Sequence, residues 1–337
     1  MIHRHFLIMG CGSVGKRHAK NLIALGCRIS CFDPNHDRCL ELASGMPVVQ
    51  SFGNLADALS ITDLDGVIIC SPTAFHPEQT IKALSRGLPV LLEKPPARTA
   101  ADARRMVDVM RSTGLPVLLG YTWRWWPPLA RVRELVMAGR IGRILHVQFH
   151  MSAHLADWHP WEPYQDFFMA SAAQGGGALL DESHWIDLMV WFFGLPEKLS
   201  GRVELISDLE IETDDNVDVH LTYPNNLRIT IHLDLYGRPH EKFIRFIGEK
   251  GTILWSVEPN RIAIGNKSSQ TWDEEFFSFD RNDMFMSVAR EFLDVVNGAP
   301  IRTCTLDDGV RVMDIIEAIR TSSAEDRTVV LNKEPIQ

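Results

Sequence analysis

A glycine-rich turn close to the amino terminus restricts the fold of this chain more than any other segment. An apolar run at residues 5–9 leads into Gly10-Cys11-Gly12-Ser13-Val14-Gly15, and residues 16–25 then show helical periodicity up to a further glycine. In such a turn the first glycine permits the tight bend, the second lets backbone approach a pyrophosphate, and the third lets the helix pack on the strand. The phosphates would face the amino terminus of the helix. Strand, turn and helix in this order predict a dinucleotide site formed by Gly10, Gly12, Ser13, Val14 and Gly15.

An acidic residue ends the next apolar run and bears on the choice of cofactor. Residues 28–32 have the pattern of a second strand, and Asp33 follows it, 18 residues beyond Gly15. A carboxylate there would accept hydrogen bonds from both hydroxyls of the adenosine ribose and repel a 2′-phosphate, which favours NAD over NADP. Arg38 is near enough in sequence to hold that phosphate, so NADP stays an alternative. Asp33-Pro34 could also simply open a turn.

Predicted strands and helices alternate through the first third of the sequence. Apolar runs predict strands at residues 48–50, 67–70, 89–92 and 117–120, and helical periodicity predicts helices at 55–60, 77–86 and 101–111. Six strands alternating with helices indicate an α/β fold with a doubly wound parallel sheet. Ligands of such sheets bind at the carboxyl ends of the strands.

Polar residues follow two of these strands at that edge. Ser71, Pro72 and Thr73 come after the fourth strand, with His76 just beyond, and Glu93-Lys94 ends the fifth strand ahead of two prolines. We expect Ser71, Pro72, Thr73, Glu93 and Lys94 to reach the cofactor. His76 either touches the cofactor or caps a helix. Taken alone, Lys94 is equally consistent with an ordinary surface lysine at the end of a strand.

Composition and charge exclude several classes of partner. The 337 residues suffice for two domains, and the net charge of −9 comes with scattered Lys and Arg, so neither nucleic acid nor a membrane surface is an expected partner. The apolar run at the start is too short for a signal peptide or a membrane span, which predicts a cytoplasmic protein. The six cysteines form no CxxC pair, so we expect reduced thiols rather than disulfides or a zinc site.

Beyond residue 122 the order of predicted strands and helices changes. Segments at 144–151, 217–223, 227–235, 243–247 and 252–255 alternate or run apolar like strands, with few helices between them. This pattern predicts an antiparallel sheet and a division into domains at 1–122 and 123–337. Helices would cover one face of that sheet. The other face, if apolar, would form a homodimer or homotetramer interface.

Three titratable residues recur on one predicted helix of this second part. After three glycines, residues 178–193 have helical periodicity, and Asp181, His184 and Asp187 follow one another at intervals of three. At about 100° per residue the three side chains spread over roughly 120° of the helix and can face one cleft. The helix thus carries a candidate acid–base histidine between two carboxylates. A buried, hydrogen-bonded structural histidine is the alternative.

Four motifs in a fixed order resemble one known family. GCGSVGKRH, SPTAFH, EKPP and GYTWRWWP follow the first, fourth, fifth and sixth predicted strands, and together they are similar to the Gfo/Idh/MocA oxidoreductases. The resemblance continues through GGGALLDESHWIDLMVWFFG and FIGEKGTI, so it covers nearly the whole chain. It implies a Rossmann domain, then an α/β domain with a large, mostly antiparallel sheet. It also implies hydride transfer between a nicotinamide cofactor and a sugar, cyclitol or related alcohol, without metal.

The resemblance assigns roles to individual residues. Lys94 matches the family's lysine close to the reacting carbon, and its neighbours Glu93 and Pro95 match residues that shape the nicotinamide end of the pocket. Oxidising an alcohol requires a base within hydrogen-bond reach of the hydroxyl, and histidine suits this role near neutral pH. We therefore assign His184 as acid or base, Lys94 as its electrostatic partner, and Asp181 as an orienting or substrate-binding group.

Two features set this chain apart from most of the family. Asp181 lies three residues before His184, where most members place the aspartate four before, so the role of Asp181 is less secure. That spacing and the segment 157–164, DWHPWEPY, resemble a branch associated with bacterial surface-sugar and sialic-acid-like pathways. Within this reading Trp158, Trp161 and Arg124 are assigned to the substrate, although tryptophans more often fill a core.

Three functions remain open from the sequence. The leading hypothesis is an NAD-dependent dehydrogenase of a sugar or nucleotide sugar. An inositol-like cyclitol dehydrogenase is a second enzyme of the same chemistry. A non-catalytic dinucleotide-binding regulator is the rival from another class, and the presence of both Lys94 and His184 argues against it.

Overall fold

The computed structural model describes residues 4–158, 162–266 and 271–331, which form two compact units. Unit 1 comprises residues up to 125 together with 280–313, and unit 2 comprises 126–279 together with the residues from 314 onward. The sequence-based division assigned everything after residue 122 to the second domain. In the structure, residues 280–313 pack with the first unit because the helix they contain contributes apolar side chains to its core.

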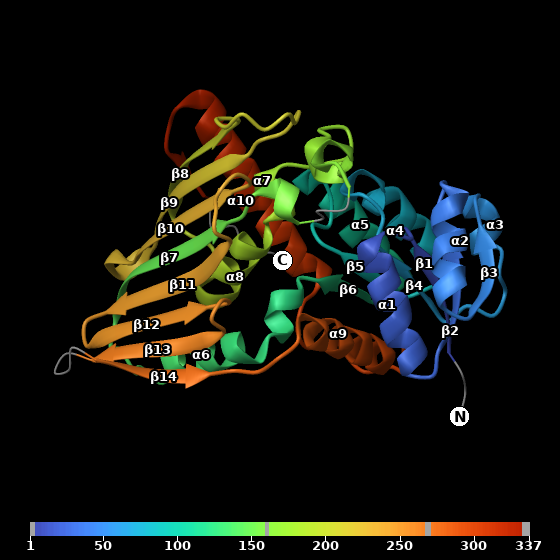
Figure 1. The fold of residues 1–337 in the computed structure, drawn as a ribbon, viewed down its shortest axis with the longest axis horizontal. Coiled ribbons are helices and arrows are strands. Elements are labelled where there is room, and N and C mark those ends of the chain that lie inside the picture. The colour runs from blue at the N-terminus through green and yellow to red at the C-terminus, as the bar shows by residue number, and fades with distance from the viewer. Residues whose placement is uncertain (1–3, 159–161, 267–270, 332–337) are drawn as a thin grey trace. The chain divides into compact units, whose positions relative to one another are not determined.

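Unit 1 is built on a six-stranded parallel sheet of order β3-β2-β1-β4-β5-β6 (Figure 1). Its strands are β1 (His5–Met9), β2 (Arg28–Phe32), β3 (Val48–Phe52), β4 (Gly66–Ile69), β5 (Val90–Glu93) and β6 (Val117–Gly120). Its helices are α1 (Ser13–Ala24), α2 (His36–Gly45), α3 (Leu55–Leu59), α4 (His76–Ser85), α5 (Ala100–Thr113) and α9 (Arg281–Val296), with 3-10 turns η1 (Thr73–Phe75) and η2 (Thr122–Trp125). This order confirms the predicted doubly wound sheet.

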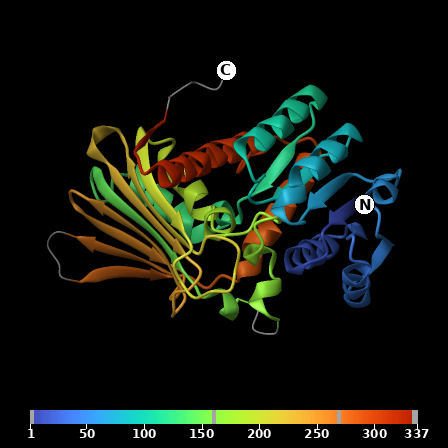
Figure 2. The same cartoon turned by 90° about the horizontal axis from the view of Figure 1, so that it is seen from above.

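Helices cover both faces of this sheet. Helices α4 and α5 pack together on one face, and α1 and α9 pack together on the other (Figure 2). Strands β1, β4, β5 and β6 are buried on both sides and are mainly apolar without alternation, as in all-parallel sheets generally. The edge strand β3 is partly exposed. Phe292 of α9 joins the core cluster formed by Phe6 and Ile8 of β1, which explains why a segment so late in the chain belongs to unit 1.

Unit 2 contains a nine-stranded sheet of order β14-β13-β12-β11-β7-β10-β9-β8-β15. Its strands are β7 (Ile144–Ser152), β8 (Lys198–Glu204), β9 (Asn216–Thr222), β10 (Arg228–Asp234), β11 (Glu241–Gly248), β12 (Gly251–Ser256), β13 (Arg261–Asn266), β14 (Trp272–Phe276) and β15 (Val329–Val330). Only the β7–β10 pair is parallel among the strand pairs that the structure describes. The predicted second domain with a mostly antiparallel sheet is therefore confirmed.

The remaining elements of unit 2 are helices and short turns. They are α6 (Pro127–Met137), α7 (Ala178–Asp181), α8 (His184–Phe193), and 3-10 turns η3 (Leu155–Asp157), η4 (Tyr164–Asp166), η5 (Phe168–Ala170) and η6 (Pro224–Asn226). Helix α10 (Leu306–Glu325) begins in unit 1, and its residues from Asp314 onward belong to unit 2. None of the described helices is both long and apolar enough to cross a membrane.

The two faces of the unit 2 sheet differ in chemistry. Side chains such as Phe149, Ile231 and Phe246 are fully buried on the face that carries α8, whereas the opposite face carries no helix of the described chain (Figures 1 and 2). That open face presents His150 and His232, whose rings stack with centroids 5.2 Å apart. The open face thus carries polar side chains and is not the apolar surface that we expected of an oligomer interface. The homodimer or homotetramer stays a prediction.

One predicted helix proves to be two. Residues 178–193 form α7 and α8, which are separated at Glu182 and Ser183. Glu182 has ψ of 19°, outside the helical range, and its buried carboxylate accepts a hydrogen bond from the indole of Trp185 at 3.1 Å. Asp181 therefore ends one helix and His184 begins the next, so the two do not follow a single helical register.

Candidate functional site

The glycine turn of unit 1 leaves room for a ligand at one glycine only. A Cβ on Gly10 would lie 2.6 Å from the backbone nitrogen of Ser71, and one on Gly15 would lie 1.9 Å from the carbonyl oxygen of Gly10. At Gly12, by contrast, no atom lies within 4 Å of the added Cβ. Gly12 is also the N-cap of α1, and no side chain caps this helix. An open, uncapped helix terminus is a fitting place for a pyrophosphate.

Asp33 is held at the end of β2 by two backbone amides. Its Oδ2 accepts a hydrogen bond from the amide of Cys11 at 2.9 Å, and its Oδ1 accepts one from the amide of Asn35 at 2.9 Å. The residue is only 4% exposed. A carboxylate can accept about four hydrogen bonds, so both oxygens retain capacity for ribose hydroxyls. These residues fit the adenosine half of a dinucleotide.

His76 joins the ends of β4 and β5. Its Nδ1 lies 2.8 Å from the carbonyl oxygen of Pro95, and its Nε2 lies 2.8 Å from the carbonyl oxygen of Ser71. Burial lowers the pKa of His76, against the two carbonyl contacts that favour the protonated ring. His76 is the first residue of α4, yet both ring nitrogens are engaged with the loops after the strands. We infer that His76 positions these loops, and its predicted contact with the cofactor stays a prediction.

Glu93 and Lys94 follow one another at the end of β5. Nε2 of His18 donates to Oε1 of Glu93 at 2.7 Å, and the amide of Lys94 lies 3.3 Å from Oε2 of the same carboxylate. Glu93 is buried, whereas Lys94 is half-buried, and the peptide between Lys94 and Pro95 is cis. The carboxylate thus supports the backbone from which Lys94 projects. His18 was not among the predicted site residues, although it ends the GCGSVGKRH motif.

In unit 2, the segment that carries His184 is anchored at its beginning by Asp214. The carbonyl oxygen of Asp214 accepts from the amide of Ala178 at 2.9 Å, and its Oδ2 accepts from the amide of Leu179 at 2.7 Å. Gly177 has φ of 103°, and a Cβ there would lie 2.3 Å from Oδ1 of Asp214. Glycine is therefore required at the point where Asp214 caps α7.

The three titratable residues of this segment differ in burial. Asp181 is 6% exposed, Asp187 is fully buried, and His184 is half-buried at the first position of α8. A histidine with partial access to solvent can exchange a proton with a ligand. The burial of Asp187 is more consistent with a supporting role than with direct contact to a substrate.

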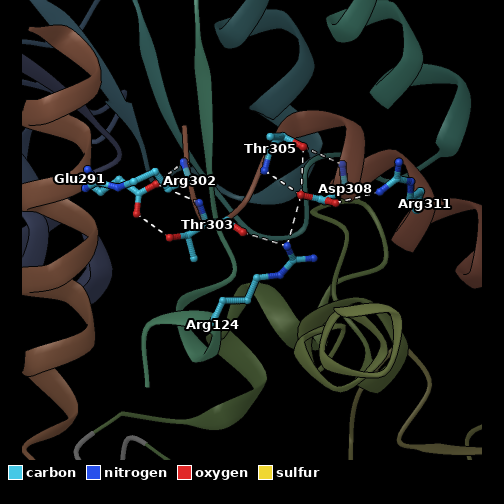
Figure 3. Close-up of polar contacts among 7 residues, drawn as sticks. All are labelled: Arg124, Glu291, Arg302, Thr303, Thr305, Asp308 and Arg311. Carbon is cyan, nitrogen blue, oxygen red and sulfur yellow. Dashed lines mark hydrogen bonds and ion pairs between the residues drawn. The ribbon is translucent and has the colours of Figure 1, made fainter. Parts of the chain in front are cut away.

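Arg124 belongs to a buried polar network of unit 1 (Figure 3). Its Nη1 donates to the carbonyl oxygen of Thr303 at 3.0 Å and to Oδ2 of Asp308 at 3.2 Å, and the side chain is only 4% exposed. Glu291 lies on the other side of the 302–305 segment and accepts from the amides of Arg302 and Thr303. The contacts described for Arg124 are thus to protein, and its predicted role with the substrate stays a prediction.

The structure describes one of the two tryptophans that were assigned to the substrate. Trp158 is half-buried, and its indole nitrogen has no hydrogen-bond partner within the described part of the chain. Trp161 lies outside the described residues. Their role stays a prediction.

Comparisons with known proteins identify the family of both parts of the chain. A family model described as "Oxidoreductase family, NAD-binding Rossmann fold" matches residues 4–121, and one described as "GFO/IDH/MocA C-terminal domain" matches residues 129–254. The rhizopine catabolism protein MocA of Rhizobium meliloti is 29% identical over 194 residues, which are 56% of this chain and 56% of that protein. The scyllo-inositol 2-dehydrogenase (NAD(+)) of Bacillus subtilis is 26% identical over 221 residues, 64% of this chain and 62% of that one.

A solved structure supports the fold over its full length. Levoglucosan dehydrogenase in complex with NADH superposes with a TM-score of 0.87 at 18% identity, covering 98% of this chain and 100% of that one. In sequence, the chain spans little more than half the length of the curated relatives named above. The resemblance to a surface-sugar branch, drawn from residues 157–164, is not supported, because relatives of similar identity are inositol dehydrogenases.

Proposed function

Because this chain belongs to the Gfo/Idh/MocA family of oxidoreductases, we propose that it transfers a hydride between NAD and a hydroxyl-bearing or keto carbon of a cyclitol or sugar. The observation that carries the proposal is the placement of Lys94 in unit 1. The lysine follows β5 of the same parallel sheet whose β1 ends in the open glycine turn, and ligands bind at the carboxyl ends of such strands. A lysine at this edge can reach the reacting end of a nicotinamide cofactor.

Unit 1 supplies the groups for the cofactor and for charge stabilisation. Gly12 would admit the pyrophosphate and Asp33 the adenosine ribose, which supports NAD over NADP. When bound, the nicotinamide supplies the hydride acceptor or donor. The ammonium group of Lys94 would donate a hydrogen bond to the substrate oxygen and stabilise the negative charge that develops on it as the proton leaves.

Unit 2 supplies the candidate proton acceptor. In the oxidation direction His184 would take the hydroxyl proton, and in the reduction direction it would return that proton to the carbonyl oxygen. Asp181, at the end of α7, would orient the substrate or the imidazole. The break between α7 and α8 supports this pairing less strongly than a continuous helix would, so Asp181 is the less secure of the two.

The substrate class rests on the relatives. One is named for scyllo-inositol, and the solved structure is named for levoglucosan, an anhydrosugar. Both molecules are rings that bear several secondary hydroxyl groups. We propose a substrate of this kind, either a cyclitol or a cyclic sugar, held without metal.

A non-catalytic dinucleotide-binding regulator is the competing function. It would need the glycine turn and Asp33 but neither the ammonium of Lys94 nor the imidazole of His184. The presence of both groups favours the enzyme. A cytoplasmic location and a homodimer or homotetramer accompany the proposal, and light scattering during size-exclusion chromatography measures the latter.

The first experiment measures cofactor binding and turnover on one sample. Fluorescence titration compares NADH with NADPH, and absorbance of the reduced nicotinamide then follows a panel of inositols, anhydrosugars and free sugars. We expect tighter binding of NADH and turnover of at least one ring polyol. Tight NADH binding with no turnover on any ring polyol, in either direction, would count against the enzyme and favour the regulator.

A further inference from the structure

Three buried cysteines from separate parts of unit 1 converge beside the glycine turn. Cys11 lies in the turn, Cys31 in β2 and Cys39 in α2, and each is fully buried. Their sulfur atoms all lie within 4.8 Å of one another, with those of Cys11 and Cys39 3.7 Å apart. The proposed oxidoreductase chemistry uses none of these thiols. We refer to the three residues as the thiol triad.

The spacing of the triad suits a single metal ion. A zinc–sulfur bond is about 2.3 Å long, so three sulfurs in a plane around such an ion lie about 4.0 Å apart. The observed separations therefore need only small adjustments to receive an ion. Thiolates select soft cations over the hard ions that carboxylates and water prefer. Within the described residues the triad offers three ligand atoms and no fourth side-chain ligand.

Charge decides which soft cation fits best. Three thiolates around a divalent ion carry one net negative charge, whereas around a monovalent ion they carry two, and a buried charge is costly. The carboxylate of Asp33, which bonds the amide of Cys11, adds to that cost. A divalent ion that accepts three sulfur ligands, such as Cd²⁺ or Hg²⁺, is therefore the best match.

Loading the site releases the protons of all three thiols, because the thiolate rather than the thiol binds a metal ion. Three sulfur–hydrogen bonds break and three sulfur–metal bonds form, and the protons pass to solvent.

We propose that Cys11, Cys31 and Cys39 form a binding site for one soft divalent cation, and that its occupation disturbs the adjoining dinucleotide site. The link between the two is Cys11, whose sulfur would bind the ion while its amide bonds Asp33. Moving the Cys11 sulfur toward the ion displaces the backbone that positions the ribose-binding carboxylate. Binding of the ion does not depend on the proposed function, whereas the effect on NADH rests on it.

Cadmium titration of the reduced protein tests the site directly. We expect one tightly bound Cd²⁺ per chain, sulfur-to-cadmium charge-transfer absorption in the ultraviolet, and three sulfur neighbours by X-ray absorption. A variant with Cys27→Ala, Cys70→Ala and Cys304→Ala keeps only the triad and should bind in the same way. Cys39→Ala should weaken binding by more than about 100-fold, since loss of even an outer hydrogen-bond partner of a ligand costs about 10–100-fold.

The outcomes separate the site from its alternatives. Two results would overturn the proposal. The first is that folded Cys39→Ala binds cadmium as well as the wild type does. The second is that the triad-only variant binds no cadmium although it melts at the wild-type temperature. Mass loss of two hydrogens under mild oxidation, with no cadmium uptake by the reduced protein, would make the triad a Cys11–Cys39 disulfide site instead. NADH titration of the cadmium-loaded protein should show weaker binding than the metal-free form. If the metal-free protein does not bind NADH, the proposed function is contradicted, whereas the proposed metal site is not affected.

Discussion

Nε2 of His18 lies 2.7 Å from Oε1 of Glu93, and both side chains are buried within unit 1. His18 lies in α1, the helix that follows the glycine turn, and Glu93 is the last residue of β5, next to Lys94. The contact therefore connects the segment proposed to bind phosphate with the segment proposed to act on the substrate. Nδ1 of His18 has no partner among the described residues, so the contact with Glu93 is the one hydrogen bond that the structure describes for this imidazole.

Replacing His18 by Ala should destabilise unit 1. The change leaves a buried carboxylate oxygen without its donor, which costs about 1–3 kcal/mol. Chemical denaturation measures the free energy of unfolding. His36→Ala, at an exposed histidine of α2, is the control and should change it by less than about 0.5 kcal/mol. Equal effects of the two substitutions would show that the bond to Glu93 contributes nothing.

Replacing Lys94 by Ala should abolish most turnover and spare the cofactor. Loss of a positioned ammonium at a developing oxyanion lowers kcat by about 100–1,000-fold. NADH fluorescence titration should give nearly the wild-type affinity. Lys82→Ala, at an exposed lysine of α4 paired with Glu78, is the matched control. Wild-type kcat in Lys94→Ala would remove this residue from the mechanism.

Asp33→Asn should shift the preference between the two dinucleotides. The amide keeps the shape of the carboxylate but loses its charge, so NADH affinity should fall by about tenfold, the equivalent of one charge-assisted hydrogen bond. NADPH affinity should hold or rise because the repulsion of the 2′-phosphate is gone. Asp37→Asn, at an exposed position of α2, serves as control. A parallel loss for both nucleotides would mean that Asp33 acts only through the amides of Cys11 and Asn35.

Glu291→Gln should weaken unit 1 through the network of Figure 3. Each carboxylate oxygen of Glu291 accepts two hydrogen bonds, Oε1 from the amides of Arg302 and Thr303 and Oε2 from Trp125 and the Thr303 hydroxyl. An amide nitrogen cannot accept, so about 1–3 kcal/mol of unfolding free energy should be lost. Glu78→Gln, at an exposed residue of α4, is the control and should change the free energy of unfolding little. A wild-type unfolding midpoint in Glu291→Gln would contradict the network.

The stability of unit 2 should decline as alkaline pH removes the proton from the imidazolium of His232. Hydrogen bonds to Asp234 and Asp218 raise the pKa of His232 from 6.5 to about 9. A pKa raised on folding contributes stability that is complete below pH 6.5 and is lost as pH rises through 9.

Melting temperatures of wild type and His232→Gln test this across that range. The difference between them should be largest at or below pH 6.5 and should shrink as pH passes 9. His220→Gln, an exposed histidine of the neighbouring β9, should show no such trend. A difference that stays constant with pH would exclude protonation of His232 as its source.

The sequence predicted the six-stranded sheet well because most of its strands are buried on both faces and therefore apolar. It missed β8 and β13 to β15, of which β14 and β15 contain no buried residue. All five residues of β14 are exposed, so an edge strand of this kind carries no apolar alternation. Helix α2 was also missed, since only Cys39 and Leu42 of its ten residues are buried.

The candidate site was predictable only where its residues stand in local motifs. Gly12, Asp33 and Lys94 could be assigned from strand ends, because position at the end of a parallel strand follows from the order of elements. The pairing of His18 with Glu93 joins residues 75 positions apart, and no periodicity reports such a contact. The break at Glu182, where a buried carboxylate accepts a hydrogen bond from Trp185, is likewise not visible in a repeat of three.

Unit 1 is not a continuous piece of the chain, and this has a consequence for its biogenesis. A ribosome that has made residues up to 125 has still to add 155 more before it reaches the first residue of α9. Until then the nascent nucleotide unit lacks Phe292, and Phe6 of β1, whose ring packs against that of Phe292, keeps part of its apolar surface exposed. Completion of this core must wait for late synthesis, so a gene fragment ending at residue 125 should yield an aggregation-prone product rather than a separable domain.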